Sequence, residues 1–510
     1  MNKQEAFFNH ITEGNTNKGE YITLGSAMLD GKTIKNAFVN VPLKTMNRHG
    51  LIAGATGTGK TKTLQVLAEN LSEKGVPVIL MDIKGDLSGL AQPSPGHAKI
   101  DERHEAIGLP FEPKAFPVEI LTLSAQNGVR LRATISEFGP VLISRILDVT
   151  ETQAGIISVI FKYCDDNKLP LLDLKDFKKI LQYATDKGKK EFEEAYGRIS
   201  TASTGAILRK IVELEQQGGD LFFGEKSFDP QDLLRVDENG RGYINIIRLT
   251  DIQDKPKLFS TFMLSLLAEI YSTFPEQGDT GRPELIMFID EAHLIFNEAS
   301  KALLNQIESI VKLIRSKGVG LYFVTQNPTD VPEAVLSQLG LKVQHALRAF
   351  TAKDRKAIKL TAQNYPDTEY YDTANVLTSL GTGEALVSAL NEKGRPTPLA
   401  ATMMRAPMSR MDILTDTELE NLLNNSKLVK KYNEEVDRES AYEMLNEKIE
   451  QAEAEELKEK ARKEKEALEK AKSKSTSSRK STRMNPIVKV LTSATFIRSV
   501  FGILTKVMKK

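Results

Sequence analysis

The chain has 510 residues, and its hydrophobic fraction of 40% is enough to bury the core of a large domain or of more than one domain. Its 69 basic and 68 acidic residues nearly cancel, so the overall charge neither supports nor excludes a nucleic-acid partner. The single cysteine, Cys164, excludes an internal disulfide and a zinc site made of cysteines. The sequence shows no signal-peptide pattern and no apolar run of about 18 residues, so we expect a cytoplasmic protein without a transmembrane span.

After an N-terminal segment of residues 1–20, residues 21–410 show the pattern of one α/β domain. Short apolar runs alternate with amphipathic helical patterns, as in a sheet that helices cover on both faces. The clearest strand candidates are Gly50–Ala53, Val76–Asp82, Tyr243–Ile247, Leu285–Asp290 and Gly320–Thr325. Because each is almost continuously apolar, we expect a mainly parallel sheet. A helix ending near Gly75 is predicted after the first of these strands.

Residues of about 90–240 depart from this alternation and show longer helical patterns, such as Val141–Tyr163 and Phe177–Ala184. We interpret this range as a helical insertion packed against the sheet.

The composition changes again after residue 410. Residues 411–475 are predicted to form a charged helical or coiled segment. Because residues 434–472 lack sustained apolar a and d positions, a solvated single helix is favoured over a weak coiled coil. Residues 476–510 combine a basic, serine-rich linker with a basic amphipathic helix that begins near Pro486. That helix could make a peripheral membrane contact, dock on a protein partner, or pack on the chain's own globular body.

A glycine-rich turn between the first strand candidate and its helix matches the phosphate-loop pattern G-x-x-x-x-G-K-[ST]. Glycines let the backbone approach the ligand closely, and the N-terminal end of the following helix favours an anion. The lysine supplies a cation for the β- and γ-phosphates, and the threonine hydroxyl supplies a ligand for Mg²⁺. The expected nucleotide contacts are Gly54, Ala55, Thr56, Gly57, Thr58, Gly59, Lys60, Thr61 and Lys62. A later glycine turn, Gly381–Glu384, has no following lysine and is not a second phosphate loop.

Two carboxylates stand at the end of the strand candidate Leu285–Asp290, namely Asp290 itself and Glu291. Ligands of open α/β sheets bind at the carboxyl ends of the strands, so both side chains are expected beside the phosphate loop. We predict that Asp290 and Thr61 hold Mg²⁺ and that Glu291 is the base that polarises the attacking water. Such a pair favours hydrolysis over mere nucleotide storage.

Two further polar residues flank the strand candidate Gly320–Thr325. Gln326, at its end, could sense the γ-phosphate or cap a turn. Arg315 lies on the helical stretch Ile307–Lys317 before the strand, and an isolated arginine in such a place is more often a surface residue than a catalytic one. The residues alone leave these alternatives open.

Several of these motifs together resemble the HerA/FtsK superfamily of ring ATPases: the phosphate loop, the DEAH tetrapeptide of Asp290–His293, and RSKGVGLYFVTQNP of Arg315–Pro328. DIKGDLSG (Asp82–Gly89) and GTGEALVSALNEKGRPTP (Gly381–Pro398) make the chain most similar to the HerA-like helicase C-terminal domain of bacterial YjgR-type proteins. The resemblance covers about residues 21–407.

The resemblance implies a RecA-like P-loop ATPase that binds ATP and Mg²⁺ and assembles as a homo-hexamer around DNA. Glu291 would be the catalytic base, Gln326 the sensor, and Arg315 an arginine finger that reaches into the neighbouring subunit. The resemblance does not extend to the β-barrel domain with which HerA begins, since too few residues precede the phosphate loop. A NurA-type nuclease partner and processive DNA-end resection are therefore not implied by the resemblance.

The leading interpretation is an ATP-hydrolysing ring motor, a DNA translocase or helicase-type ATPase. Its candidate DNA contacts are Lys342, Arg348, Lys353 and Arg355. One alternative is a nucleotide-switched oligomeric ATPase that acts on a protein partner recruited by the C-terminal segment. A peripheral membrane ATPase is another. A DEAH-box helicase is excluded, because the sequence shows no second RecA-like core with an arginine–glycine motif.

Overall fold

The computed structural model describes residues 2–475, except 253–254, 279, 299–300, 350, 435 and 437. The chain divides into two compact units, Met1–Leu445 and Asn446–Lys510. The predicted basic linker and amphipathic helix of residues 476–510 lie outside the described residues. Within the described part of the chain, no helix combines the length and the apolar character needed to cross a bilayer.

The first unit is built on one sheet, which contains twelve strands within the described residues. In spatial order these are β2 (Lys32–Pro42), β1 (Tyr21–Leu29), β12 (Ala400–Met404), β11 (Glu384–Ser388), β10 (Leu341–His345), β3 (Gly50–Ala53), β9 (Val319–Thr325), β8 (Leu285–Ile289), β4 (Val78–Asp82), β7 (Ile244–Arg248), β5 (Val118–Thr122) and β6 (Val129–Arg130). The strands from β10 to β6 pair in parallel. The other four form an antiparallel extension at one side.

The five strands predicted from apolar runs form most of the parallel part of this sheet. Each begins or ends within two residues of its predicted bounds, and β3, β4, β8 and β9 are buried along their whole length. Burial on both faces is the reason that these strands read as continuous apolar runs rather than as alternating ones. The expectation of a mainly parallel α/β sheet is therefore confirmed.

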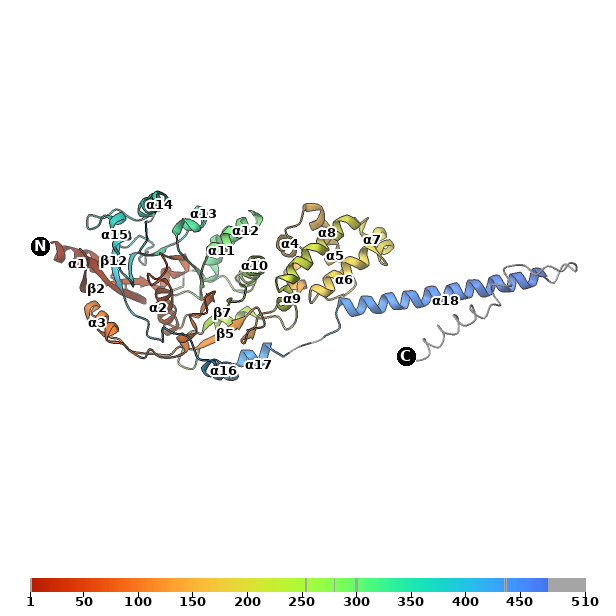
Figure 1. Ribbon diagram of the computed structural model, residues 1–510, viewed down its shortest axis with the longest axis horizontal. Coiled ribbons are helices and arrows are strands. Elements are labelled where there is room, and N and C mark those ends of the chain that lie inside the picture. The colour runs from red at the N-terminus through yellow and green to blue at the C-terminus, as the bar shows by residue number, and fades with distance from the viewer. Residues whose placement is uncertain are drawn as a thin grey trace. The chain divides into compact units, whose positions relative to one another are not determined.

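Helices pack around the sheet and also form a separate group beside it (Figure 1). Their bounds are α1 (Lys3–Gly14), α2 (Lys60–Glu73), α3 (Ala98–Ile107), α4 (Ile135–Ile146), α5 (Glu151–Asp166), α6 (Leu174–Thr185), α7 (Lys189–Tyr196), α8 (Thr201–Gln216), α9 (Gly219–Phe222), α10 (Pro256–Thr273), α11 (His293–Glu298), α12 (Lys301–Leu313), α13 (Glu333–Leu336), α14 (Ala352–Gln363), α15 (Thr373–Ser379), α16 (Asp416–Asn425), α17 (Lys427–Tyr432) and α18 (Ala441–Ser475). Helices α4 to α9 make up the separate group, which lies to the right of the sheet in Figure 1.

The range of about 90–240 is less uniformly helical than its sequence pattern indicates. It also contributes β5 and β6 to the main sheet, so the helical group begins only at Ile135. The helical pattern over Val141–Tyr163 is divided into α4 and α5, because the side chain of Thr150 accepts a hydrogen bond from the Gln153 N–H and caps a new helix there.

The N-terminal helix α1 packs on the same core as the sheet. Phe7 and Ile11, one helical turn apart, are fully buried in the cluster that also contains Ile52 of β3 and Val324 of β9. Residues 3–14 are thus held by apolar contacts to the domain that follows them.

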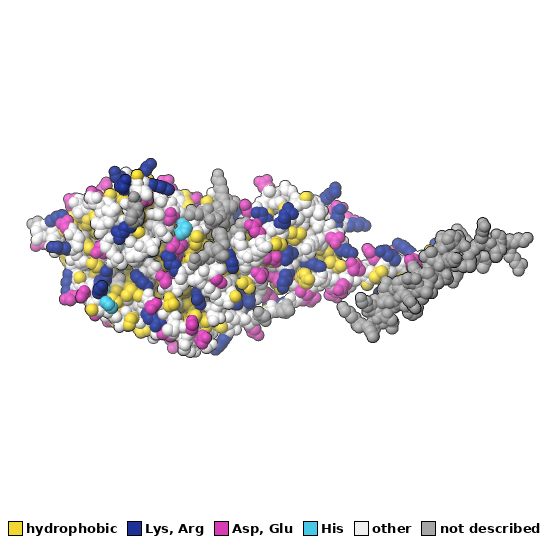
Figure 2. Space-filling view, viewed as in Figure 1, with side chains coloured by type: hydrophobic (Ala, Val, Ile, Leu, Met, Phe, Trp, Pro, Cys, Tyr) yellow, Lys and Arg dark blue, Asp and Glu magenta, His cyan; other side chains and the backbone are white. Residues whose placement is uncertain are grey.

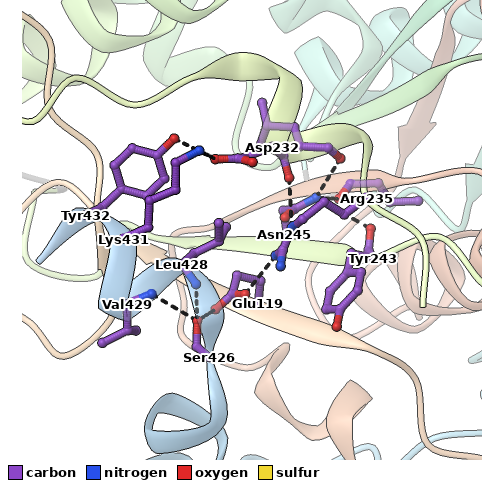
Figure 3. A network of polar contacts seen from close by, with 12 residues as sticks. Glu119, Asp232, Arg235, Tyr243, Asn245, Ser426, Leu428, Val429, Lys431 and Tyr432 are labelled. Carbon is purple, nitrogen blue, oxygen red and sulfur yellow. Dashed lines mark hydrogen bonds and ion pairs between the residues drawn. The ribbon is translucent and has the colours of Figure 1, made fainter. Parts of the chain in front are cut away.

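Helix α17 is fastened to the sheet at the side of β5 and β7 by a polar network (Figure 3). The Ser426 hydroxyl donates to Oε1 of Glu119 (2.6 Å), and the other oxygen of Glu119 accepts from Arg235 (2.7 Å). The Tyr432 hydroxyl donates to Oδ2 of Asp232 (2.5 Å). Glu119 is almost fully buried, so its charge needs these partners. Helix α18 follows, and its residues 451–470 are exposed, as a solvated charged helix requires.

Candidate nucleotide site

The phosphate loop connects β3 to α2 at the carboxyl edge of the parallel strands. Gly54, Gly57 and Gly59 have φ angles of 152°, 76° and 116°, which favour glycine. A Cβ on Gly54 would lie 2.5 Å from Cβ of His345. Only a residue without a side chain fits at this position. Gly59 is the N-cap of α2, and the first N–H groups of that helix have no partner within the helix. This geometry suits a phosphate group.

The Lys60 side chain lies inside the loop. Its ammonium donates to the carbonyl oxygens of Gly54 (2.6 Å) and Ala55 (3.1 Å). Burial and the nearby charge of Lys84 lower the pKa of Lys60, whereas Glu291 and Asp290 oppose this shift. Thr61 follows in the first turn of α2 and is partly exposed.

The second glycine turn, Gly381–Glu384, packs against the phosphate loop. The Gly383 N–H donates to the carbonyl oxygen of Thr58 (2.9 Å), and a Cβ on Gly59 would lie 3.2 Å from Gly383. The turn is not a second phosphate loop, as predicted, and it packs against the first one instead.

His345 joins the same two turns. Its Nδ1 donates to the carbonyl oxygen of Glu384 (2.9 Å), and this bond leaves Nε2 to accept from the Thr63 hydroxyl (2.9 Å). Burial lowers the pKa of His345 to about 4, so the ring is neutral at physiological pH.

Asp290 and Glu291 follow β8 at the same edge as the phosphate loop, as predicted. Oδ1 of Asp290 accepts from the Glu291 N–H (2.9 Å), and Glu291 has a left-handed backbone with φ 47°. Oε2 of Glu291 lies 3.3 Å from Nδ1 of His293 but accepts no hydrogen bond from the described residues. Burial raises the pKa of Asp290 to about 6, against the opposing charge of Lys84.

Lys84 also lies at this site, although the sequence pattern did not single it out. Its Nζ lies 2.7 Å from Oε1 of Glu291 and 3.9 Å from Oδ2 of Asp290. The residue belongs to the DIKGDLSG stretch, part of the family resemblance, and lies just after β4. A charged residue just after a buried strand is the sequence signal for such a position.

Gln326 also lies at this edge, because it follows β9, the parallel neighbour of β3. Its side chain is exposed. The structure therefore brings together Lys60, Thr61, Asp290, Glu291 and Gln326 at one edge of the sheet.

Arg315 lies elsewhere, in the 3₁₀ helix Ile314–Lys317 that precedes β9. The seven residues of β9 separate it from the carboxyl edge, a distance of about 20 Å along the strand. Arg315 cannot reach the phosphate loop of its own chain across that distance. It lines a cavity of about 520 Å³ together with Arg48, Lys312 and Lys342, and no Asp or Glu is among the described residues that line it.

A family model, Helicase HerA-like C-terminal, matches residues 28–509. The fold and the site are those of a P-loop ATPase with a RecA-like sheet. The chain belongs to the HerA-like helicase C-terminal family.

Similar proteins agree with this assignment. The chain is 23% identical over 376 residues to the DNA double-strand break repair helicase HerA of Sulfolobus acidocaldarius, a match that covers 70% of this chain and 66% of that protein. It is also 23% identical to the DNA import protein CedB of the same organism, with 73% of this chain and 54% of that protein covered. The chain thus spans slightly less than two thirds of the HerA relative.

Among solved structures, the bacterial conjugative coupling protein TrwB has the same fold, with a TM-score of 0.50 and 15% sequence identity. The match covers 79% of this chain and 93% of that one.

Proposed function

We propose that this protein is an ATP-hydrolysing ring motor that translocates DNA. The observation that carries the proposal is the convergence of Lys60, Asp290 and Glu291 at one edge of the sheet, beside a loop shaped for phosphate. Relatives named as a DNA repair helicase and a DNA import protein support DNA as the substrate.

The residues at the site fit a nucleotide with Mg²⁺. Asp290 is a buried carboxylate and Thr61 a partly exposed hydroxyl, and Mg²⁺ prefers such oxygen donors while keeping several waters. When bound, the ion would neutralise charge that develops on the phosphates. Asp290 and Thr61 would hold it.

The chain's own groups account for the remaining chemistry. Lys60 binds the β- and γ-phosphates, and the N-terminal end of α2 favours their charge. Glu291 orients and polarises a water molecule, with Oε2 free of hydrogen bonds to the described residues. Gln326 contacts the γ-phosphate or the attacking water and reports on hydrolysis.

Arg315 acts as a finger in the active site of a neighbouring subunit. Its position at the far edge of the sheet supports this role, because the chain's own phosphate loop is out of its reach. A finger supplied by a neighbour makes hydrolysis depend on assembly, and the proposed assembly is a homo-hexamer.

We propose that DNA contacts helix α14 and the loop before it. Figure 2 shows Lys and Arg side chains gathered over α14, which carries the exposed Lys353 and Arg355, and Arg348 is exposed in the preceding loop. Contacts of these residues with DNA phosphates would weaken as salt increases. Lys342 lies on β10 and lines the cavity with Arg315 instead.

The alternative is a nucleotide-switched oligomeric ATPase that acts on a protein partner. The exposed helix α18 favours it, since a long charged helix offers a surface for a partner. Hydrolysis in an assembled oligomer that ignores DNA would support this alternative over the motor.

The test is ATP hydrolysis with and without DNA, with the mass of the protein followed by light scattering. We expect DNA-stimulated hydrolysis in the assembled form only. Arg315→Ala and Lys60→Ala proteins should each be inactive, and mixing them should restore activity, because one supplies intact phosphate loops and the other intact fingers. A monomer that hydrolyses ATP at full rate would contradict the proposed role of Arg315.

A further inference from the structure

Lys84 occupies a position that the proposed mechanism does not use. Its side chain is 41% exposed, whereas those of Asp290 and Glu291 are 7% and 9% exposed, so the lysine reaches the two buried carboxylates from the solvent side. The contact with Glu291 is a direct ion pair at 2.7 Å. This ion pair occupies Oε1 of Glu291, an oxygen that a water molecule at the base would otherwise contact.

The loop that carries Lys84 is fixed by a buried carboxylate. Oδ1 of Asp82 accepts from the N–H groups of Gly85 (2.7 Å) and Asp86 (3.2 Å), and Oδ2 accepts from Leu87 (3.2 Å). Gly85 has φ 77°, which completes the tight turn. The backbone of Lys84 is therefore positioned beside the site, and its long side chain, which is partly exposed, extends from that turn to the carboxylates.

Two ammonium groups meet at this site. Lys60 and Lys84 are close enough for the charge of Lys84 to lower the pKa of Lys60. The γ-phosphate of ATP carries more negative charge than one carboxylate and would attract both cations. ADP lacks the γ-phosphate.

We propose that Lys84 changes partner when ATP binds: its ammonium leaves Glu291 for the γ-phosphate, and this exchange frees Glu291 to polarise water. The inference rests on the proposed ATPase function and adds a residue that couples recognition of the γ-phosphate to release of the base. ADP, which has no γ-phosphate, leaves Lys84 on Glu291.

The exchange is tested by fluorescence titration of the full-length protein with ATPγS and with ADP. We expect Lys84→Met to weaken ATPγS binding about ten-fold and to change ADP binding less than two-fold. Lys84→Arg should retain most of the preference for ATPγS. Lys99→Met, which removes the same charge from an exposed side chain in α3, should bind both nucleotides as the wild type does.

A double-mutant cycle separates partner exchange from a fixed ion pair. If Lys84 must leave Glu291, then Glu291→Gln strengthens ATPγS binding more when Lys84 is present than in the Lys84→Met background. A lysine that stays on Glu291 screens the negative charge of Glu291. In that case Glu291→Gln strengthens ATPγS binding less when Lys84 is present than in the Lys84→Met background. Thermal unfolding followed by circular dichroism verifies that each variant is folded.

The outcomes distinguish the two proposals. An unchanged ATPγS preference in Lys84→Met, or a gain from Glu291→Gln that is no larger with Lys84 than without it, overturns the partner exchange. A wild-type protein that binds neither nucleotide overturns the proposed function itself.

Discussion

The two edges of the parallel sheet arrange their charges in different ways. At the carboxyl edge, positive and negative side chains lie close together: Nζ of Lys84 is 2.7 Å from Oε1 of Glu291 and 3.9 Å from Oδ2 of Asp290. At the amino edge, Arg48, Lys312, Arg315 and Lys342 line one cavity with no Asp or Glu among its described lining residues. Burial lowers the pKa of Lys342, so its charge is poorly solvated there.

This difference in charge indicates that the two edges of the sheet bind different groups. A site that contains both charges can bind a nucleotide with its metal within one chain. A cationic cavity attracts an anion from outside the chain. In the proposed ring, each active site would combine the carboxyl edge of one subunit with the amino edge of the next.

The largest expected effect is that of Arg315→Ala. Since an arginine finger stabilises charge in the transition state, we expect the rate constant of hydrolysis to fall about 1000-fold while ATP affinity stays nearly unchanged. Steady-state hydrolysis and nucleotide titration measure the two quantities. Lys312→Ala is the matched control, because it removes one charge from an exposed side chain of the same cavity. Equal losses of hydrolysis rate in both variants would mean that the positive charge of the cavity as a whole matters, and would contradict a specific role of Arg315.

The carboxyl edge is tested by Lys60→Ala. Loss of the phosphate-binding ammonium should lower hydrolysis about 100-fold and should also weaken ATP binding, since this contact forms in the ground state. Lys74→Ala is the control, because it removes the same charge just after the far end of α2, where Nζ of Lys74 lies 3.3 Å from Oε1 of Glu20. A Lys74→Ala variant as inactive as Lys60→Ala would contradict the specific role of Lys60.

A third test concerns pH, through the buried His345 behind the phosphate loop. Its pKa of about 4 lies below the ordinary value of 6.5, so between these pH values the unfolded chain binds more protons than the folded one. This histidine therefore costs stability as the pH falls through that window, by about 2 kcal/mol at pH 5.

His345→Gln should accordingly lose less stability than the wild type between pH 7.5 and pH 5, as measured by urea unfolding. The exposed His10→Gln serves as the control. Comparing variants at each pH matters, because Asp82, Asp290 and Glu69 have raised pKa values and act in the opposite direction. The same pH slope in His345→Gln and the wild type would contradict a neutral, buried ring.

The smallest effect on hydrolysis is expected from Ser426→Ala. Ser426 caps helix α17 and belongs neither to the nucleotide site at the carboxyl edge nor to the cavity at the amino edge. The Ser426 hydroxyl accepts from the N–H groups of Leu428 and Val429 and donates to Glu119. Losing this cap should lower the free energy of unfolding by about 1–2 kcal/mol. Hydrolysis at 25 °C should be unchanged, and a loss of activity without unfolding would mean that α17 is coupled to the nucleotide site.

The strands and the phosphate loop could be predicted because their signals are local. Leu285–Ile289 reads as a buried strand from five apolar residues, and Gly59, Lys60 and Thr61 carry their chemistry at fixed spacing. Strands β1 and β2 could not be predicted in the same way. They pair antiparallel at the side of the sheet, and their burial patterns are irregular.

By itself, the sequence determined that this chain has a parallel α/β core, a phosphate loop, and two carboxylates at the end of a strand. These follow from residue types at short spacing, where backbone geometry leaves few choices. Only the tertiary structure decided that Lys84 lies on Glu291, that Gly383 supports the phosphate loop, and that Arg315 faces the opposite edge. Those contacts join segments up to 325 residues apart, and the order of strands in the sheet, rather than any local pattern, brings such segments together.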